Sequence, residues 1–273
     1  MKAHDVAFLS LESTFHDREG IPSALSGGTW AMSDPRILDD VDYLLGSHTT
    51  GLDDEGSDIT PGSHGSLASF KYDVTFRGMA AHAGGSPHLG KNALLAASSA
   101  VVNLYAIPRH GAGASRINVG RLIAGSGRNV IADEAFMEME VRGDTTAINE
   151  YVSEYALRIL ENTAAMHGCT VEVKLMGAAE SLVSDLPLCQ RIADVCADKL
   201  GMKVSSHLSI KLGGSEDFSY MVNRVQSHGG QAVFMRTRSP LAAGAHNRKF
   251  DFDESYLTKA VKVFCGMAYD LMQ

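Results

Sequence analysis

Apolar and polar side chains alternate from Lys71 onward, and this is the clearest pattern in the chain. Tyr72, Val74 and Phe76 occupy the apolar positions, with polar residues between them. A period of two residues is typical of a strand with one buried face. We therefore expect a structured domain to begin near residue 70.

The segments that follow predict two helices and three more strands. Helices are indicated where apolar residues recur every three to four positions or where Ala, Leu and Val dominate, and strands where apolar residues alternate with polar ones. The expected elements are a buried helix over Asn92 to Ile107, strands over Arg116 to Ile123 and Val130 to Val141 joined by a Gly-rich turn, an amphipathic helix from Ile148 to Met166, and a strand over Thr170 to Met176. This order is that of a ferredoxin-like domain, which we place at residues 70–178.

Helices and strands also alternate after this domain, which favours an α/β fold. The expected elements are helices over Pro187 to Leu200, Glu216 to Ser227 and Ser255 to Leu271, and strands over Val204 to Ile210 and Gln231 to Met235. The first 69 residues are rich in turn signals, so they are poor material for a core by themselves. Residues 1–69 and 179–273 should form one discontinuous α/β domain, which the ferredoxin-like domain interrupts.

Composition and charge narrow the class of protein. The 273 residues are 45% hydrophobic and carry a net charge of -8, with a pI of about 5.7. Nothing in this balance indicates a nucleic-acid or anionic-membrane partner, either of which would require a basic face. The four cysteines form no C-x-x-C pair, and no secretory or membrane-spanning run is present, so we expect reduced thiols and a cytoplasmic protein.

Four short stretches place a His, Asn or Arg beside glycines, which permit close approach of the backbone to a ligand. They are "GMAAHAGG" with His82, "GSGRNVI" with Asn129, "VRGD" with Arg142, and "GAHN" with His246. A single His in a Gly-rich loop is more often a surface residue, and Arg142 alone could cap the end of a strand. The four stretches indicate a functional site more strongly than any one of them alone, because they occur together in one order.

With "GASRINVG", "GGSEDFSYM" and "HNRKFDFDES", these stretches resemble the metal-dependent amidohydrolases of the aminoacylase and carboxypeptidase G type. The resemblance extends from about Leu38 to the C-terminus and is strongest to the p-aminobenzoyl-glutamate hydrolase group. It implies a discontinuous remnant of a two-metal aminopeptidase-like catalytic domain with an inserted ferredoxin-like lid, through which the chains dimerise. It also implies hydrolysis of the amide bond of a small N-acyl amino acid.

The resemblance assigns roles to individual residues. His82 would donate a hydrogen bond to the oxyanion of the tetrahedral intermediate. Asn129 and Arg142 would hold the substrate carboxylate. The divalent ions, zinc or manganese, would bind His4, His48 and His246. A metal-bound water would be the nucleophile, with a glutamate as its general base.

The sequence departs from the family pattern before residue 30. Lys2 stands at the position of a metal-binding cysteine, and no acid lies between Pro22 and Gly28, where a pair of glutamates is expected. A truncated gene, a misassigned start or a pseudoenzyme would explain this. Asp5, Asp42 and Glu216 are the acids that could replace the missing base.

Two functional hypotheses therefore stay open. The first is an amidohydrolase that is impaired or inactive as this chain alone. The second is a noncatalytic dimerisation or ligand-binding protein, which pairs with itself or with a paralogous subunit. A metal titration separates the two.

Overall fold

The computed structural model describes residues 6–8, 38–244 and 247–273 of the chain. Among these, residues 67–181 form one compact unit, which we call the lid unit. Residues 6–8, 38–66 and 182–273 belong to a second compact unit, the α/β unit. Lys2, His4, the stretch Pro22 to Gly28 and His246 lie outside the described residues.

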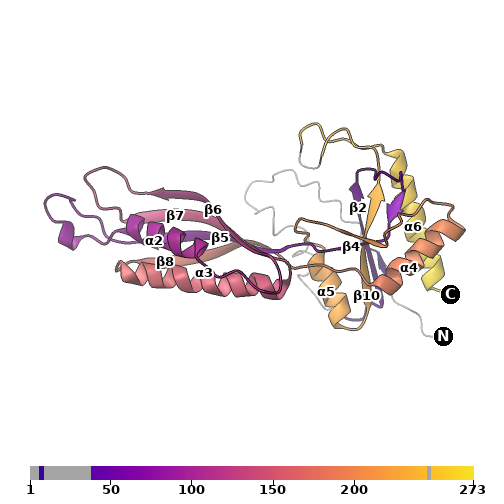
Figure 1. The fold of residues 1–273 in the computed structure, drawn as a ribbon, viewed down its shortest axis with the longest axis horizontal. Helices are drawn as coiled ribbons and strands as arrows, with labels where there is room; N and C mark the ends of the chain where they lie inside the picture. The colour runs from indigo at the N-terminus through magenta and orange to yellow at the C-terminus, as the bar shows by residue number, and fades with distance from the viewer. Residues whose placement is uncertain (1–5, 9–37, 245–246) are drawn as a thin grey trace. The chain divides into compact units, whose positions relative to one another are not determined.

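The lid unit contains one antiparallel sheet of four strands with two helices (Figure 1). Its elements are β5 (Ala68–Arg77), the short 3-10 helix η2 (Pro87–Leu89), α2 (Ala93–Tyr105), β6 (Ser115–Ala124), β7 (Glu134–Gly143), α3 (Thr146–Met166) and β8 (Thr170–Ala179). The strand order is β6-β7-β5-β8, so the first and third strands of the unit lie in the centre of the sheet. The expected ferredoxin-like order of elements is thereby confirmed.

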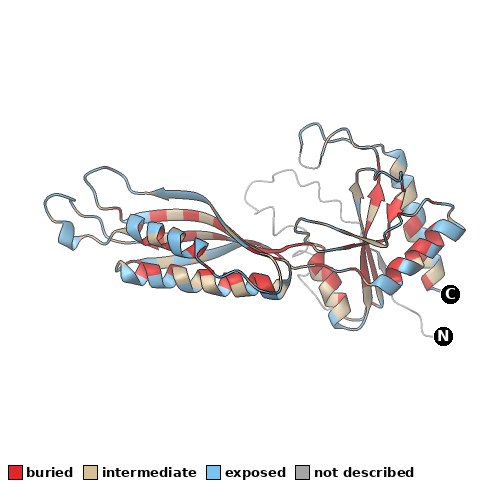
Figure 2. Ribbon diagram, in the orientation of Figure 1, coloured by how far each residue is buried: buried red, intermediate tan, exposed pale blue. Residues whose placement is uncertain are grey.

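The alternation that predicted β5 also explains the core of the lid unit. Tyr72, Val74 and Phe76 are buried and pack with inward residues of β7 and with both helices. Buried positions alternate with less buried ones along β5 and β7, as the banded strands of Figure 2 show. Side chains of Asn92 and Thr145 cap the two helices, each accepting a hydrogen bond from a backbone N–H at 3.2 Å.

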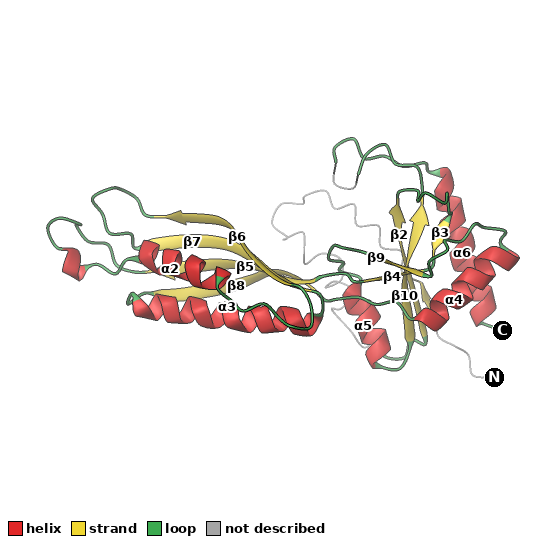
Figure 3. Ribbon diagram, in the orientation of Figure 1, coloured by secondary structure: helices red, strands yellow, loops and turns green. Residues whose placement is uncertain are grey.

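The α/β unit contains a four-stranded mixed sheet of order β1-β2-β10-β3 and a two-stranded sheet, β4-β9 (Figure 3). Its strands are β1 (Val6–Phe8), β2 (Tyr43–Thr50), β3 (Ile59–Thr60), β4 (Gly62–His64), β9 (Ser209–Lys211) and β10 (Gln231–Arg238). Its helices are α4 (Leu186–Asp194), which continues as a π-helix η3 (Val195–Lys199), α5 (Ser219–Ser227) and α6 (Ser255–Leu271). Strands β1 and β10 both run parallel to β2.

Helices cover both faces of the larger sheet. Leu45 and Val233 face a core cluster that includes α4 and α6, whereas Leu44 and Phe234 face a cluster that includes α5. Neighbouring residues of one strand point to opposite faces, so both faces are apolar. The α/β unit is thus a three-layer arrangement, with β2 and β10 at its centre.

Residues 38–66 supply part of the core of the α/β unit, where they pack with residues 182–273. Strand β2 lies in this region, and Leu44 and Leu45 are fully buried. A parallel strand buried on both faces shows a continuous apolar run and no alternation, and this run was too short to stand out. The strand expected from Val204 is also shorter, because Val204 forms only an isolated bridge to Ile59 and β9 begins at Ser209.

The cysteines are free thiols, three of them buried and Cys265 exposed. Burial raises the pKa of Cys189 and Cys196 to about 12, so both thiols stay protonated at neutral pH. No helix in the described part of the chain is both long and apolar enough to cross a membrane.

Candidate functional site

Two loops that are distant in sequence pair at one end of the lid sheet. The backbone N–H of Ala83 donates to the carbonyl of Asn129, and the N–H of Ile131 donates to the carbonyl of Ala81, both at 2.9 Å. His82 and Val130 form the bridge between these bonds. The structure therefore brings His82 and Asn129 onto neighbouring segments at the surface of the lid unit.

The loop around His82 fixes the state of its imidazole. Nδ1 of His82 lies 3.1 Å from the backbone N of Gly84 and 2.9 Å from that of Gly85. A backbone N–H can only donate, so Nδ1 must be the accepting, unprotonated nitrogen. The neutral ring then carries its proton on Nε2. His82 is consequently a preset hydrogen-bond donor at the surface of the lid.

Arg142 of β7 is held by a carboxylate from its own strand. Its Nε and one terminal nitrogen each lie 3.0 Å from an oxygen of Glu140. Both side chains are about one-third exposed, at 31%. Residues two apart on a strand share one face, which is why the pair forms. The guanidinium thus has the bidentate geometry expected for a substrate carboxylate, with Glu140 occupying that position.

Strand β7 keeps Arg142 away from the paired loops. The loops adjoin Arg77 and Glu134, which face each other in register, whereas Arg142 faces Ser69 and Arg116 at the other end of the strands. Arg142 lies eight positions beyond Glu134, which corresponds to roughly 27 Å at about 3.4 Å per residue. Within one chain, Asn129 and Arg142 cannot hold the same carboxylate, contrary to expectation.

In the α/β unit, His48 lies near the carboxyl end of β2. Its Nδ1 is 2.6 Å from the carbonyl oxygen of Thr49. A carbonyl can only accept, so Nδ1 carries the proton and Nε2 is unprotonated in the neutral ring. In this tautomer Nε2 is the ring nitrogen with which His48 could bind a cation. The carboxyl ends of parallel strands are also where α/β sheets bind ligands.

Two charged residues lie at the same end of the sheet. Arg236 of β10 pairs in register with His48, and its Nε is buried without a hydrogen-bond partner among the described residues. Burial raises the pKa of Glu216 to about 7, with a further rise from Asp217 and an opposing effect of Arg236. A carboxyl with a pKa near neutrality can both accept and release a proton at physiological pH.

The described residues do not make a metal site by themselves. No group of three or more His, Cys, Asp or Glu side chains that could hold an ion occurs among them. Of the three expected ligands, only His48 is described, because His4 and His246 lie outside. Asp42 precedes β2 and is exposed. No reaction step can therefore be routed through a metal from these residues.

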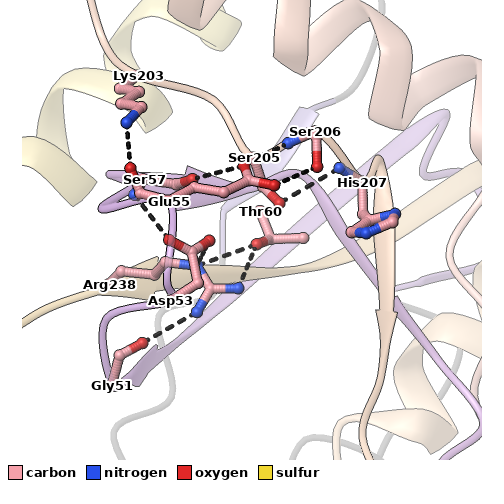
Figure 4. Close-up of polar contacts among 10 residues, drawn as sticks. All are labelled: Gly51, Asp53, Glu55, Ser57, Thr60, Lys203, Ser205, Ser206, His207 and Arg238. Carbon is pink, nitrogen blue, oxygen red and sulfur yellow. Dashed lines mark hydrogen bonds and ion pairs between the residues drawn. The ribbon is translucent and has the colours of Figure 1, made fainter.

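A polar network stabilises the loop that follows β2 (Figure 4). Arg238 lies 3.1 Å from a carboxylate oxygen of Asp53 and donates to Thr60 and to the carbonyl of Gly51. Glu55 accepts hydrogen bonds from the backbone N–H and hydroxyl of Ser206. These side chains connect the loop to β3, to β10 and to the segment before β9. Their role is to hold the carboxyl end of β2 in place.

Sequence reasoning missed Glu140 and Arg236. The signal for Glu140 was its position two residues before Arg142 in a strand, which places both side chains on one face. The signal for Arg236 was an arginine directly after the apolar run of β10. Glu216 was considered only as a substitute base, since sequence gives no measure of its burial.

Comparison of the chain with known proteins identifies its relatives. A model of the peptidase dimerisation domain matches residues 64–167. Residues 64–167 belong to that domain family. The chain is also homologous, at 41% identity, to a p-aminobenzoyl-glutamate hydrolase subunit of Escherichia coli, over 88% of this chain and 55% of the relative. The indole-3-acetyl-aspartic acid hydrolase of Enterobacter agglomerans is 42% identical over 86% of this chain and 54% of the relative.

Solved structures are similar to this chain over residues of both the lid unit and the α/β unit. The aminobenzoyl-glutamate utilization protein of Klebsiella pneumoniae has a TM-score of 0.71 and 37% identity, over 84% of this chain and 55% of that one. A dinuclear metal-binding peptidase of Bacillus subtilis shares the fold at 20% identity and a TM-score of 0.62, over 92% and 63%. The chain spans little more than half the length of the curated relatives named above.

Proposed function

We propose that this chain is the lid-bearing part of an amidohydrolase that cleaves the amide bond of an N-acyl acidic amino acid such as p-aminobenzoyl-glutamate. The observation that carries the proposal is His82, whose loop fixes an outward Nε2–H donor in a dimerisation domain shared with such hydrolases. A donor preset at the position of developing negative charge stabilises the tetrahedral intermediate. The names of two relatives specify amides of glutamate and aspartate.

Arg142 is proposed to bind the carboxylate of the amino-acid part of the substrate. Glu140 occupies the carboxylate position of the guanidinium in the free chain, and the incoming carboxylate takes its place. Because β7 separates Arg142 from His82 and Asn129, two copies of the chain must contribute to each site. A homodimer formed through the lid unit supplies this arrangement, and a paralogous subunit is the alternative partner.

Residues 1–69 and 179–273 are proposed to be the partial catalytic domain, and residues 70–178 the lid. Glu216 is the described carboxyl best suited to transfer a proton there, because burial raises its pKa to about 7. Zinc or manganese held by His4, His48 and His246 stays a prediction, as does the cytoplasmic location. No step of the proposed chemistry is assigned to a metal.

A noncatalytic ligand-binding protein is the second candidate function. Two features of the sequence favour it: Lys2 at a cysteine position and the lack of an acid between Pro22 and Gly28. Turnover of p-aminobenzoyl-glutamate, assayed with added zinc or manganese, separates the candidates. Hydrolysis that disappears in Glu216→Gln supports the enzyme, whereas binding without hydrolysis supports the second candidate.

Ligand binding by mixed variants tests the two-copy site. Calorimetry should show strong binding of p-aminobenzoyl-glutamate to the wild type and almost none to Asn129→Ala or Arg142→Ala alone. Mixing the two variants should restore sites equal to about a quarter of the wild-type number, since half of the dimers are mixed and each has one intact site. Arg121→Ala, which removes another exposed arginine of the lid sheet, is the control and should bind normally.

Two outcomes would contradict the proposal. The mixed variants could bind no better than either variant alone. His82, Asn129 and Arg142 would then not form a binding site that is shared between two chains. Undiminished binding by Arg142→Ala would remove the carboxylate role of that residue.

A further inference from the structure

Two arginines lie directly opposite each other on neighbouring strands of the lid sheet. Arg116 of β6 is in register with Arg142 of β7. Residues paired in this way point to the same face of an antiparallel sheet, with their Cβ atoms about 5 Å apart. Ile117 and Val141, their neighbours in sequence, pack in the core with α2 and α3. Since successive side chains of a strand alternate, both arginines point to the face opposite these helices.

The arginine pair is short of carboxylates. Like charges directly opposite each other destabilise a sheet. The two nearest acids in sequence to Arg142 are already engaged, because Glu140 binds the guanidinium of Arg142 at 3.0 Å and Asp144 accepts the N–H of Ala114 at 2.6 Å. Arg116 is exposed, and its guanidinium has no carboxylate partner among the described residues. A carboxylate from a ligand would relieve the repulsion between the two arginines.

We propose that Arg116 binds the side-chain carboxylate of the acidic amino acid in the substrate, while Arg142 of the same chain binds its main-chain carboxylate. The inference rests on the proposed function, which supplies the role of Arg142. The two carboxyl carbons of glutamate are joined by a short chain with bonds of about 1.5 Å, and in the extended form they lie roughly 5 Å apart. This separation matches the cross-strand spacing of the two arginines. Each planar guanidinium can bind one carboxylate through two parallel N–H bonds.

Arg116 then determines specificity for the amino-acid part of the substrate. An N-acyl amino acid with a neutral side chain would occupy Arg142 and leave the repulsion between the arginines unrelieved. Loss of a hydrogen bond between charged groups corresponds to about tenfold or more in affinity. We therefore expect Arg116 to set the preference for acidic over neutral amino acids without affecting recognition of the acyl group.

Two matched ligands test this role on the full chain. p-Aminobenzoyl-glutamate and p-aminobenzoyl-glutamine have nearly the same shape and differ in the charge of the side chain. By calorimetry, the wild type should bind the glutamate ligand at least about tenfold more tightly than the glutamine ligand. Arg116→Ala should remove this preference by weakening binding of the glutamate ligand alone. Arg116→Lys should retain part of it, because an ammonium group keeps the charge but not the planar fork.

Two controls separate recognition from folding. Arg121→Ala removes another arginine of β6, which pairs with Glu138, and should keep the full preference for the glutamate ligand. Arg116→Ala should be at least as stable as the wild type in urea, because it removes the repulsion with Arg142. Lower stability of this variant would contradict the like-charge argument.

The possible failures of this inference and of the proposed function are distinct. A preference for the glutamate ligand that survives Arg116→Ala would overturn the inference, since another group would then recognise the side chain. Equal binding of both ligands by the wild type would also overturn it, yet it would agree with the proposed function, because Arg142 would still hold the carboxylate that the ligands share. A wild type that binds neither ligand would remove the proposed function and this inference together.

Discussion

Two histidines of this protein are held in opposite tautomers by the backbone atoms beside them. Nδ1 of His82 faces two N–H groups and must accept, whereas Nδ1 of His48 faces a carbonyl and must donate. In the neutral rings, His82 therefore presents an N–H and His48 presents a lone pair through Nε2. The first is suited to stabilise an anion and the second to bind a cation. These are the separate roles that the family resemblance implies for them.

Nitrogen-detected correlation spectra should reveal this difference directly. At a pH where both rings are neutral, we expect the proton of His82 on Nε2 and that of His48 on Nδ1. Assignment comes from His82→Gln and His48→Gln, each of which removes one set of signals. Observation of the same tautomer in both rings would contradict the hydrogen bonds that Nδ1 of each ring makes with the backbone.

Replacement of Glu140 tests whether Arg142 accepts an external carboxylate. Glu140→Gln removes the charge that competes for the guanidinium, so binding of p-aminobenzoyl-glutamate should tighten several-fold, corresponding to about 1 kcal/mol for an exposed ion pair. Glu138 lies on the same strand as Glu140 and forms an ion pair with Arg121 of β6. Glu138→Gln should leave the affinity unchanged. Weaker binding to Glu140→Gln would mean that the pair is needed to orient Arg142.

At the scale of helices and strands, the sequence predicted those elements whose apolar residues recur at regular intervals. The alternation in β5 and the helical spacing of α3 were sufficient, because each element has one buried face. Strand β2 was not predicted, because both its faces are buried and its apolar residues do not alternate with polar ones. The positions of His82 and Asn129 beside each other, and of Arg142 far from them, depend on strand register, which no local pattern of residues encodes.

The glycine at the start of the His82 loop has no room for a side chain. A Cβ on Gly78 would lie 2.0 Å from the carbonyl oxygen of Lys91, whereas one on Gly111 would meet nothing within 4 Å. We expect Gly78→Ala to destabilise the chain by about 1–3 kcal/mol, as overpacking does. Gly111→Ala, the control, should be neutral or slightly stabilising. Denaturant unfolding of both variants measures the difference, and equal stability would contradict the close contact.

The carboxylate of Asp53 neutralises a buried arginine. The side chain of Arg238 is only 9% exposed, and Asp53 is its ion-pair partner. Asp53→Ala leaves that charge without compensation, which should cost about 3 kcal/mol. Asp54→Ala changes the exposed neighbour and should shift the unfolding free energy by less than about 0.5 kcal/mol. If the two variants unfold alike, the ion pair contributes nothing to the loop that follows β2.

For the whole molecule, the partly buried carboxyl of Glu216 should make stability depend on pH. Burial raises its pKa from 4.5 to about 7, so the folded chain retains a proton that the unfolded chain releases. Its contribution is fully present below pH 4.5 and is lost as pH rises through about 7. One pKa unit corresponds to about 1.4 kcal/mol, and we therefore expect a loss on the order of 2–3 kcal/mol across this window.

Urea unfolding between about pH 5 and 8 isolates this effect when wild type and Glu216→Gln are compared. The unfolding free energy of the wild type should decrease with rising pH relative to that of the variant, because glutamine keeps the site neutral at every pH. Glu254→Gln, which removes an exposed acid, should follow the wild type. Parallel curves for wild type and Glu216→Gln would mean that the Glu216 carboxyl is ionised near its ordinary pKa, compensated by Arg236. The residue would then be a carboxylate of ordinary basicity and a weaker proton acceptor than the one proposed for the α/β unit.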